Sequence, residues 1–313
     1  MTTAERVMRI VTLNLEVDGG PAGPGNTLPE RWRAAHEDLL GPLRPDLLLR
    51  QEMTYSHLDG NSRLHAAERA LGMRGFLSPN GSGRNPTGLF VRPGVFDVVS
   101  QVEHLRTWRT PPTNISMWLD GAPGRDIVTT SWHTAFNSPR GREREADDLT
   151  ALADKMKQGK HFIGGGDCNE YPVGTGETVA EIDWTSEEIT DLVHVRHRTN
   201  KGPNGTRTSC TYLDETLLGC GLHDPARYAY HELKQERALD ATAGHAAQGQ
   251  GGGRRIDRIY LDPWLVQAVL DVRVLDTTGI SDHHGLVVDL SHAKAIEALH
   301  RRIKPLPPMS LAA

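Results

Sequence analysis

Short apolar segments with the composition of β-strands recur along this chain, and segments with the period of amphipathic α-helices lie between them. We expect strands at residues 8–15, 46–53, 87–91, 95–102, 115–119, 125–133, 161–167, 255–261 and 284–290, and helices at residues 30–43, 62–71 and 140–158. Some neighbouring strands are joined by links too short for the crossover that a parallel pair requires. The sequence therefore predicts mixed sheets with helices outside, in an α/β or α+β sandwich.

The interval from residue 170 to residue 253 is polar and rich in turn-forming residues, and its pattern assigns no clear elements. It ends in the sequence GQGGG, which predicts a flexible loop. No internal repeat and no linker divides the chain. We therefore expect one catalytic domain over residues 1–292, followed by a short helix and a Pro-rich tail over residues 293–313.

Composition restricts the class of protein. The net charge of −5 and the pI near 6.3 argue against a basic face for long nucleic acids, and aromatic residues make up only 5% of the chain. No apolar stretch approaches the roughly 20 residues of a membrane helix, and the first residues carry no secretory pattern. Three cysteines fit a reducing compartment. We expect a cytoplasmic enzyme without a membrane span; the sequence predicts no oligomeric state.

Residues with catalytic chemistry share one placement, at or just beyond the ends of the predicted strands. They are Asn14 and Glu16, Glu52, His133, Asp167 and Asn169, Asp257, and Asp282 with His283. Polar groups at strand ends can converge in one crevice of a layered α/β protein. Glu52 follows Leu47, Leu48 and Leu49, where a carboxylate is costly to bury unless it is paired or binds a metal.

These segments, in this order, resemble the endonuclease/exonuclease/phosphatase superfamily. The resemblance runs from about residue 8 to residue 290 and rests on TLNLE, RQEM, SWHTAFNS, GGDCNEYP, RIDRIYL and SDHH. Each motif alone is weak, but six in order form a specific pattern. The resemblance implies a four-layer α/β sandwich, with two mixed β-sheets packed face to face and helices on the outside.

The resemblance also implies roles for individual residues. Glu52 would hold a catalytic Mg²⁺, Asn14 would orient that carboxylate and the phosphate, and Glu16 and Asp282 would belong to the same metal site. Asp167 and Asn169 would position or activate the attacking water. His133 would stabilise developing charge or serve the leaving group, and Asp257 would orient His283.

Physical chemistry supports this assignment of roles. Hydrolysis of a phosphate ester needs a water in line with the leaving oxygen and neutralisation of charge on the equatorial oxygens. Mg²⁺ prefers oxygen ligands and keeps several waters, so one or two carboxylates suffice, with Mn²⁺ as an alternative ion. An imidazole held by a carboxylate can stabilise charge or transfer a proton. The sequence does not decide whether Asp167 or His283 is the general base.

Each residue also has an ordinary structural interpretation. Asn14 and Asn169 could be turn residues, and Asp257 could form a surface ion pair with its flanking arginines. Cys210, Cys220 and His223 could suggest zinc, but they lack CxxC spacing and an obvious fourth ligand, so we expect packed or loop thiols. The side chain of Cys168 should point away from its neighbours Asp167 and Asn169, into packing.

Substrate contacts are expected from arginines near the predicted site. Arg254 and Arg255 follow the Gly-rich loop, and Arg140 lies shortly after His133. Arginine favours bidentate contacts to phosphate, although a solvated loop is an equally good interpretation of any one of these residues.

We therefore expect Mg²⁺-dependent hydrolysis of a phosphate ester, with a phosphodiesterase, including a nuclease, as first choice. The alternative is a phosphatase or phosphodiesterase acting on a small metabolite or a lipid headgroup. A binding protein that has lost catalysis is a third possibility, and the presence of every key residue argues against it.

Overall fold

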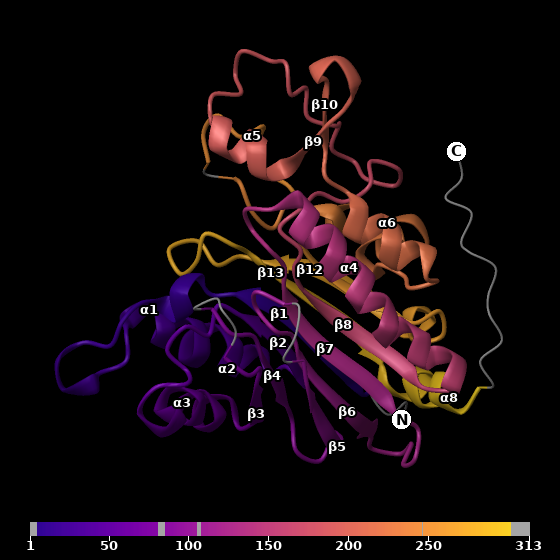
Figure 1. Ribbon diagram of the computed structural model, residues 1–313. Helices are drawn as coiled ribbons and strands as arrows, with labels where there is room; N and C mark the ends of the chain where they lie inside the picture. Colours follow the sequence, from indigo (N-terminus) through magenta and orange to yellow (C-terminus); the bar gives the residue numbers. More distant parts are fainter. Residues whose placement is uncertain (1–4, 81–84, 105–107, 246, 302–313) are drawn as a thin grey trace.

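Two β-sheets packed face to face form the centre of the protein (Figure 1). The computed structural model describes residues 5–80, 85–104, 108–245 and 247–301. The larger sheet has six strands in the order β12-β13-β1-β2-β4-β3, and the smaller central sheet has five in the order β11-β8-β7-β6-β5. Two further short strands, β9 (Thr199–Lys201) and β10 (Arg207–Ser209), form a separate ribbon.

The six-stranded sheet consists of β1 (Val7–Asn14), β2 (Leu47–Gln51), β3 (Arg74–Leu77), β4 (Gly88–Val91), β12 (Val269–Leu275) and β13 (Gly285–Ser291). The five-stranded sheet consists of β5 (Phe96–Glu103), β6 (Thr113–Leu119), β7 (Ile127–His133), β8 (His161–Asp167) and β11 (Asp257–Leu261). Each sheet contains one parallel pair, β1 with β2 and β7 with β8, and its other pairs are antiparallel. A parallel pair brings two strand C-termini to the same edge of its sheet.

Apolar side chains on both faces of the sheets create the layers. On β1, Met8 and Ile10 pack between the two sheets, whereas Val11 and Leu13 face the helices on the outer side. Burial on both faces explains the nearly continuous apolar character of β1 and β2. The prediction of a four-layer α/β sandwich with two mixed sheets is confirmed.

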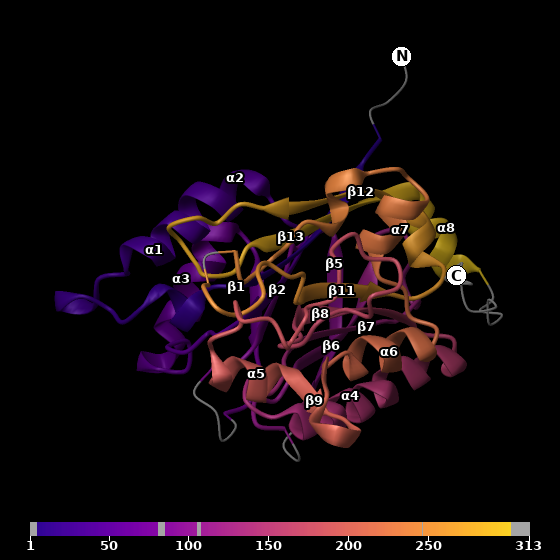
Figure 2. The ribbon, with the colours of Figure 1, turned by 90° about the horizontal axis from the view of Figure 1, so that it is seen from above.

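Helices cover the outer faces of both sheets (Figure 2). The six-stranded sheet is covered by a helical segment made of α1 (Glu30–Arg33), a π-helical stretch (Ala34–Leu40) and α2 (Gly41–Leu43), together with α3 (Ser62–Leu71). The five-stranded sheet is covered by α4 (Pro139–Ala153) and α6 (Tyr212–Gly219). Helices were expected at residues 30–43, 62–71 and 140–158, and the structure is helical over these ranges, with a 3₁₀ turn ending the last.

Several elements were not predicted. The edge strands β3 and β12 are present, and the interval 170–253 contains α5 (Leu192–Arg198), β9, β10, α6 and α7 (Pro225–His231). The ribbon and α5 project from one end of the sandwich (Figure 1). The interval is therefore folded, and part of it, through α6 and α7, packs against the core.

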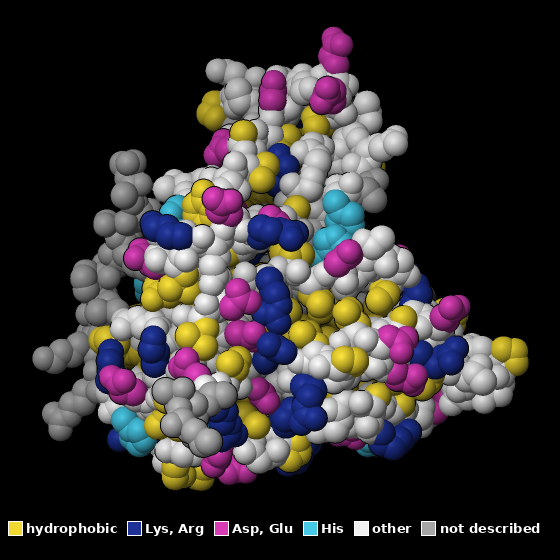
Figure 3. All heavy atoms as spheres, turned by 180° about the vertical axis from the view of Figure 1, so that it is seen from behind, with side chains coloured by type: hydrophobic (Ala, Val, Ile, Leu, Met, Phe, Trp, Pro, Cys, Tyr) yellow, Lys and Arg dark blue, Asp and Glu magenta, His cyan; other side chains and the backbone are white. Residues whose placement is uncertain are grey.

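The chain returns to the core near its C-terminal end. Helix α8 (His292–His300) buries Ala295, Ala298 and Leu299 in the cluster between the sheets, so it packs as part of the sandwich. The Pro-rich segment from residue 304 onward lies outside the described residues. Within the described ranges, no helix combines the length and apolarity that crossing a bilayer requires. Basic and acidic side chains are interspersed over the face shown in Figure 3.

Three consecutive glycines in β8 allow close approach of neighbouring elements. A Cβ atom added to Gly164 would lie 2.7 Å from the Trp132 ring, and one added to Gly166, whose φ is +148°, would lie 2.0 Å from the Trp132 carbonyl oxygen and 2.9 Å from Gln51 Nε2. Gln51 belongs to the other sheet. The absence of a side chain at Gly166 therefore allows the two sheets to approach each other closely beside the strand ends that carry the functional residues.

Replacing Gly166 with Ala should therefore destabilise the fold by about 2–4 kcal/mol, through steric overlap and backbone strain. Gly219→Ala is a matched control, because a Cβ there meets no atom within 4 Å and its φ is not positive. Urea unfolding of both variants measures the difference. An unchanged midpoint for Gly166→Ala would contradict this account of β8.

Candidate active site

The ends of strands from both sheets meet at one edge of the sandwich. Asn14 ends β1, and Glu52 directly follows β2; His133 ends β7, and Asp167 ends β8. In the β8–β11 ladder Asp257 lies opposite Asp167. These side chains were predicted from strand ends, and the structure brings them together.

The Asn14 side-chain amide joins carboxylates from the two sheets. Its Nδ2 atom lies 3.1 Å from Asp167 Oδ2 and 3.4 Å from Glu52 Oε1. The second oxygen of Glu52 accepts a hydrogen bond from the Val17 backbone N–H at 2.8 Å. The two carboxylates are therefore no further apart than two hydrogen-bond lengths, well within the span of one hydrated divalent ion.

The imidazole of His133 lies between the same two carboxylates. Its Nε2 atom is 3.5 Å from Asp167 Oδ2 and 3.9 Å from Glu52 Oε1, and its Nδ1 atom is buried without a hydrogen-bond partner among the described residues. The side chain can therefore donate toward the carboxylates or toward a phosphate oxygen placed between them.

His283 and Asp257 form a buried pair. The distance from His283 Nδ1 to Asp257 Oδ2 is 2.8 Å, and His283 Nε2 lies 3.8 Å from Asp167 Oδ2. Burial alone would lower the pKa of His283, but the carboxylates of Asp257 and Asp167 outweigh it and raise the pKa to about 10. Without a metal, the ring is therefore a cation near neutral pH, oriented by Asp257.

Asp167 is held as an ionised carboxylate. Burial acts to raise its pKa, but His283, His133 and Arg198 together outweigh burial and lower it. The Asn169 backbone N–H also donates to Asp167 Oδ1 at 2.8 Å. An ionised carboxylate in this position can accept a proton from water.

Asn169 is fixed from both sides. Its Nδ2 atom donates to the Thr134 carbonyl at 3.0 Å and lies 3.2 Å from Asp167 Oδ2, while Arg198 Nη2 donates to its Oδ1 at 2.7 Å. Arg198 comes from α5, so the interval 170–253 contributes directly to the site. The sequence-based prediction did not assign this role to Arg198, because nothing in its local pattern indicates a contact with Asn169.

Backbone strain is concentrated around the site. Glu52, Val17, Asp18 and Asn169 all have positive φ angles, of 55°, 51°, 52° and 49°, which non-glycine residues rarely adopt. Such conformations persist only where the surrounding contacts impose them. Those at Val17 and Glu52 lie on the two sides of the hydrogen bond from the Val17 N–H to the Glu52 carboxylate.

A buried ion network under this turn was not predicted. Arg50 lies 3.2 Å from Asp18 Oδ1 and 2.7 Å from His36 Nε2, while Arg63 Nη1 donates to the Asp18 carbonyl at 3.1 Å. The network fixes the turn whose Val17 N–H binds Glu52. Arg50 inside an apolar strand gave a signal for it, because a buried guanidinium requires a partner.

The oxygen atoms available at the site suit a hard divalent cation. Asn14 Oδ1 and Asp257 Oδ1 are buried and have no hydrogen-bond partner among the described residues. The pKa of Asp282 is raised by burial and by the carboxylates of Glu16 and Glu52, although His283 opposes the shift, so a cation there would relieve repulsion between like charges. The residues present therefore fit a divalent metal.

Asp282 and Glu16 occupy the rim of the site. Ser281 donates to the Asn14 carbonyl at 2.8 Å and thereby holds the neighbouring Asp282 next to β1. The Glu16 carboxylate is bound by Arg31 Nη1 at 2.6 Å and is 42% exposed. Glu16 is therefore already neutralised in part, which makes it a weaker metal ligand than Glu52.

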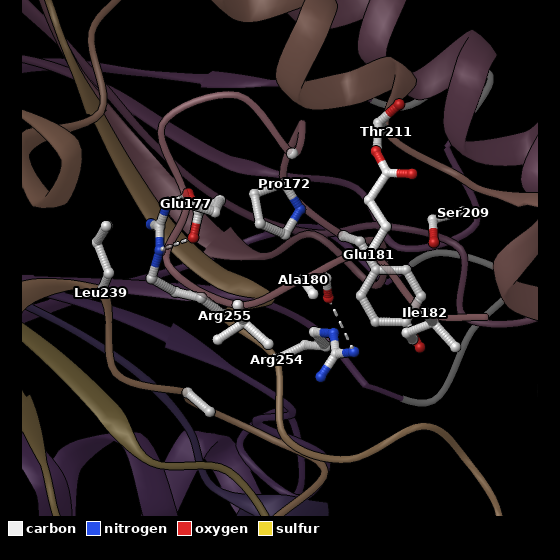
Figure 4. Close-up of a pocket in the computed structure, with 14 residues that line it drawn as sticks. Pro172, Glu177, Ala180, Glu181, Ile182, Ser209, Thr211, Leu239, Arg254 and Arg255 are labelled. Atoms are coloured by element: carbon white, nitrogen blue, oxygen red, sulfur yellow. Dashed lines mark hydrogen bonds and ion pairs between the residues drawn. The ribbon is translucent and has the colours of Figure 1, made fainter. Parts of the chain in front are cut away.

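The three arginines predicted to bind substrate differ in position. Arg254 lines a cleft beside His283. Arg255 does not fit its prediction. It is buried and paired with Glu177 at 2.6 Å and Asp224 at 2.7 Å. Its side chain points away from that of Arg254, its neighbour in an extended segment (Figure 4). Arg140 is exposed in the first turn of α4 and is not among the residues lining that cleft.

The cysteines carry no metal site in the described residues. Cys168 is buried among Trp132, Leu213 and Tyr260, so the prediction that it packs away from the site is confirmed. Cys210 and Cys220 are free thiols, and neither belongs to a metal-binding cluster of the described residues.

A family model supplies an independent comparison. The model of the Endonuclease/Exonuclease/phosphatase family matches residues 11–283, most of the chain. The chain belongs to this family. Its members are phosphoesterase hydrolases that generally depend on divalent metals, in agreement with the acidic cluster of the site.

Solved structures of this family share the fold. The 3'-5' exonuclease NExo from Neisseria meningitidis is 21% identical, with 91% of this chain and all of that chain covered and a TM-score of 0.60. A truncated TDP2 from Caenorhabditis elegans is 14% identical, with 91% and 97% covered and a TM-score of 0.56. A family protein from Bacteroides vulgatus is 13% identical, with 91% and 99% covered and a TM-score of 0.57. No curated protein sequence matches the chain.

The buried network makes stability sensitive to pH. His36 accepts from Arg50 through Nε2 and binds the Trp32 carbonyl through Nδ1, so it must be neutral. Burial, reinforced by Arg50, lowers its pKa well below 6.5. The unfolded chain therefore binds a proton that the folded chain excludes, and stability is lost as pH falls below 6.5.

We expect this histidine to cost up to about 1.4 kcal/mol of stability per pH unit below 6.5. Urea unfolding at pH 7.5, 6.5 and 5.5 measures the loss, and His36→Gln should show a shallower pH dependence. Equal slopes for both proteins would mean that His36 is not the titrating group.

Proposed function

We propose that this protein is a Mg²⁺-dependent phosphodiesterase that cleaves its substrate by in-line attack of water. The observation that carries the proposal is the bridge from Asn14 to both Glu52 and Asp167, with imidazoles of His133 and His283 within 3.8 Å of Asp167 Oδ2. Carboxylate, imidazole and amide groups, which are the groups that bind a metal and a phosphate, thus lie together at the strand ends.

The metal ligands would be Glu52, Asp282 and the unpartnered Oδ1 of Asn14, with Glu16 at the rim. A bound Mg²⁺, or Mn²⁺ in its place, supplies Lewis-acid stabilisation of charge on the phosphoryl oxygens.

The attacking water would be oriented by Asp167 and Asn169. Asp167 stays ionised because its pKa is lowered, so it can accept the water's proton as the nucleophile forms. Asn169 is held by Arg198 and the Thr134 carbonyl, which keeps its amide in place without competing for that proton.

The two imidazoles would stabilise the negative charge that develops on the substrate's oxygens. His283, oriented by Asp257, can donate from Nε2 to a phosphoryl oxygen as negative charge develops there. His133 lies beside both carboxylates and can stabilise either the same charge or the departing oxygen.

The substrate class has two candidates. A nucleic acid is supported by fold relatives, among them a 3' phosphatase from Neisseria solved with a product DNA hairpin, at 19% identity and a TM-score of 0.59. A small metabolite or lipid-headgroup ester is supported by the net charge of −5 and by the interspersed charges of Figure 3.

Three free cysteines fit a cytoplasmic setting.

Catalysis should require both the metal and the acidic groups. With bis(p-nitrophenyl) phosphate and Mg²⁺, we expect nitrophenol release that EDTA abolishes and that Asp167→Asn lowers by about 10²–10⁴-fold, because the proton acceptor is lost. Glu52→Gln should raise the Mg²⁺ concentration needed for half-maximal rate.

Glu37→Gln is the matched control, since Glu37 is exposed on the helical segment that covers the outer face of the six-stranded sheet. It should retain wild-type activity. Absence of metal-dependent turnover by the wild type across phosphate esters and nucleic acids would instead support a binding protein.

The two substrate classes differ in their response to salt. A nuclease should nick plasmid DNA with a rate that falls steeply between 50 and 200 mM salt, because bound phosphates release counterions (about 10³-fold or more for several contacts). An enzyme of small esters should release phosphate or alcohol from a metabolite panel with little salt dependence. Parallel assays of both reactions identify the class.

A further inference from the structure

A cleft of about 630 Å³ extends from the catalytic groups toward the interval 170–253. Asp282 and His283 line its catalytic end. Its other walls are formed by Tyr171 and His194, by Arg198 and Arg254, and by residues of the Gly-rich loop, among them Gly244 and Gly252. The cleft is therefore open to a part of the substrate that lies beyond the scissile phosphate.

The backbone segment that contains Ala243 lies between Arg254 and His283. Ala243 forms an antiparallel bridge to Arg254 on one side and to His283 on the other. Because neighbouring strands lie about 4.8 Å apart, the backbones at Arg254 and His283 are separated by about 10 Å. Arg254 and His283 therefore line the same cleft at separate points.

The guanidinium of Arg254 is bound by neutral groups in the described part of the chain. It donates to two neutral carbonyl oxygens, that of Gly253 at 2.7 Å and that of Ala180 at 3.5 Å, the second of which is drawn in Figure 4. Among the described residues, no carboxylate lies within ion-pair distance of Arg254 or of Arg198, which donates to Asn169 and to the Phe136 carbonyl.

Other arginines in the same part of the molecule are neutralised. The pairs are Arg142 with Glu170, Arg227 with Asp214, and Arg255 with Glu177 and Asp224. Arg254 and Arg198 form no such pair among the described residues, and neither do the buried Arg258 and the partly buried Arg207. Of these four arginines, Arg254 and Arg198 are the two that line the cleft.

The aromatic wall of the cleft adds no charge of its own. His194 Nε2 is bound by the Tyr171 hydroxyl at 2.7 Å, and burial, then Arg198, lowers the pKa of His194 to about 4. The imidazole is therefore neutral at neutral pH. Its ring packs with those of Tyr171 and Trp184, at centroid distances of 6.4 and 6.1 Å. Arg198 and Arg254 are thus the charged side chains next to this aromatic wall.

We propose that this cleft binds a second phosphate group of the substrate, next to the one that is cleaved, through Arg254, with Arg198 adding to the positive potential. This inference rests on the proposed phosphodiesterase function. A neighbouring phosphate of a polynucleotide and the second phosphate of a small bisphosphate offer the same chemistry, and either would supply the missing counterion.

A pair of chromogenic substrates isolates the second phosphate. Thymidine 5'-(p-nitrophenyl phosphate) carries only the scissile phosphate, whereas its 3'-phosphorylated form carries one more. We expect the wild type with Mg²⁺ to show a kcat/KM at least tenfold higher for the 3'-phosphorylated form. Arg254→Ala and Arg254→Gln should reduce that ratio to near one, while Arg254→Lys should retain part of it.

Arg125→Ala is the matched control. Arg125 is exposed just before β7, whose other end carries His133, so it lies about 20 Å from the site by strand length. Its removal changes the net charge by the same amount and should leave both kcat/KM values and their ratio unchanged.

The outcomes separate the two proposals. Absence of metal-dependent turnover of either ester overturns the proposed function. Turnover of both esters with equal kcat/KM by the wild type, or an equal loss on both esters in Arg254→Ala, overturns the second-phosphate site alone.

A third arm identifies the source of the second phosphate. If Arg254→Ala lowers the cleavage of a single-stranded oligonucleotide as strongly as that of the 3'-phosphorylated ester, the site takes a polynucleotide phosphate. If only the small ester depends on Arg254, the site takes a small bisphosphate. Both results support the site, and its absence in both arms overturns it.

Discussion

The candidate site depends on one side-chain amide that joins the two sheets. Asn14 ends a strand of the six-stranded sheet, and it binds Glu52 from the same sheet and Asp167 from the other. Neither sheet alone brings together the carboxylate that we propose as metal ligand, Glu52, and the one that we propose as proton acceptor, Asp167. Close packing of the sheets at Gly166, and the strained turn that presents the Val17 N–H, both serve to keep this contact in register.

Much of this arrangement could be predicted from the sequence, because apolar strands and their polar ends are local patterns. The strand ends at Asn14, Glu52 and Asp167 were visible in this way, and the family pattern supplied the layering. Strand β12 could also have been predicted, because Val272 and Val274 alternate with polar residues in the pattern typical of an edge strand. The short strand β3 contains a glycine and gives a weak pattern.

Other features depend on contacts between distant segments, which no local pattern contains. Arg198 binds Asn169, which lies 29 positions earlier in the chain. The side chain of Arg255 forms ion pairs with Glu177 and Asp224, whereas its neighbour Arg254 lines the cleft. Adjacent arginines are equivalent in a composition count. Only the direction of an extended backbone distinguishes them, since successive side chains point to opposite sides.

The position of β13 has a consequence for the timing of activity. This strand comes late in the sequence yet pairs with β1, with Val7 opposite Ser291, and it lies between β1 and β12 in the sheet. Contacts between such remote segments form slowly, and only after synthesis has passed β13. A nascent chain that has not reached residue 283 holds Asn14, Glu52 and Asp167 yet lacks His283, so its candidate site is incomplete.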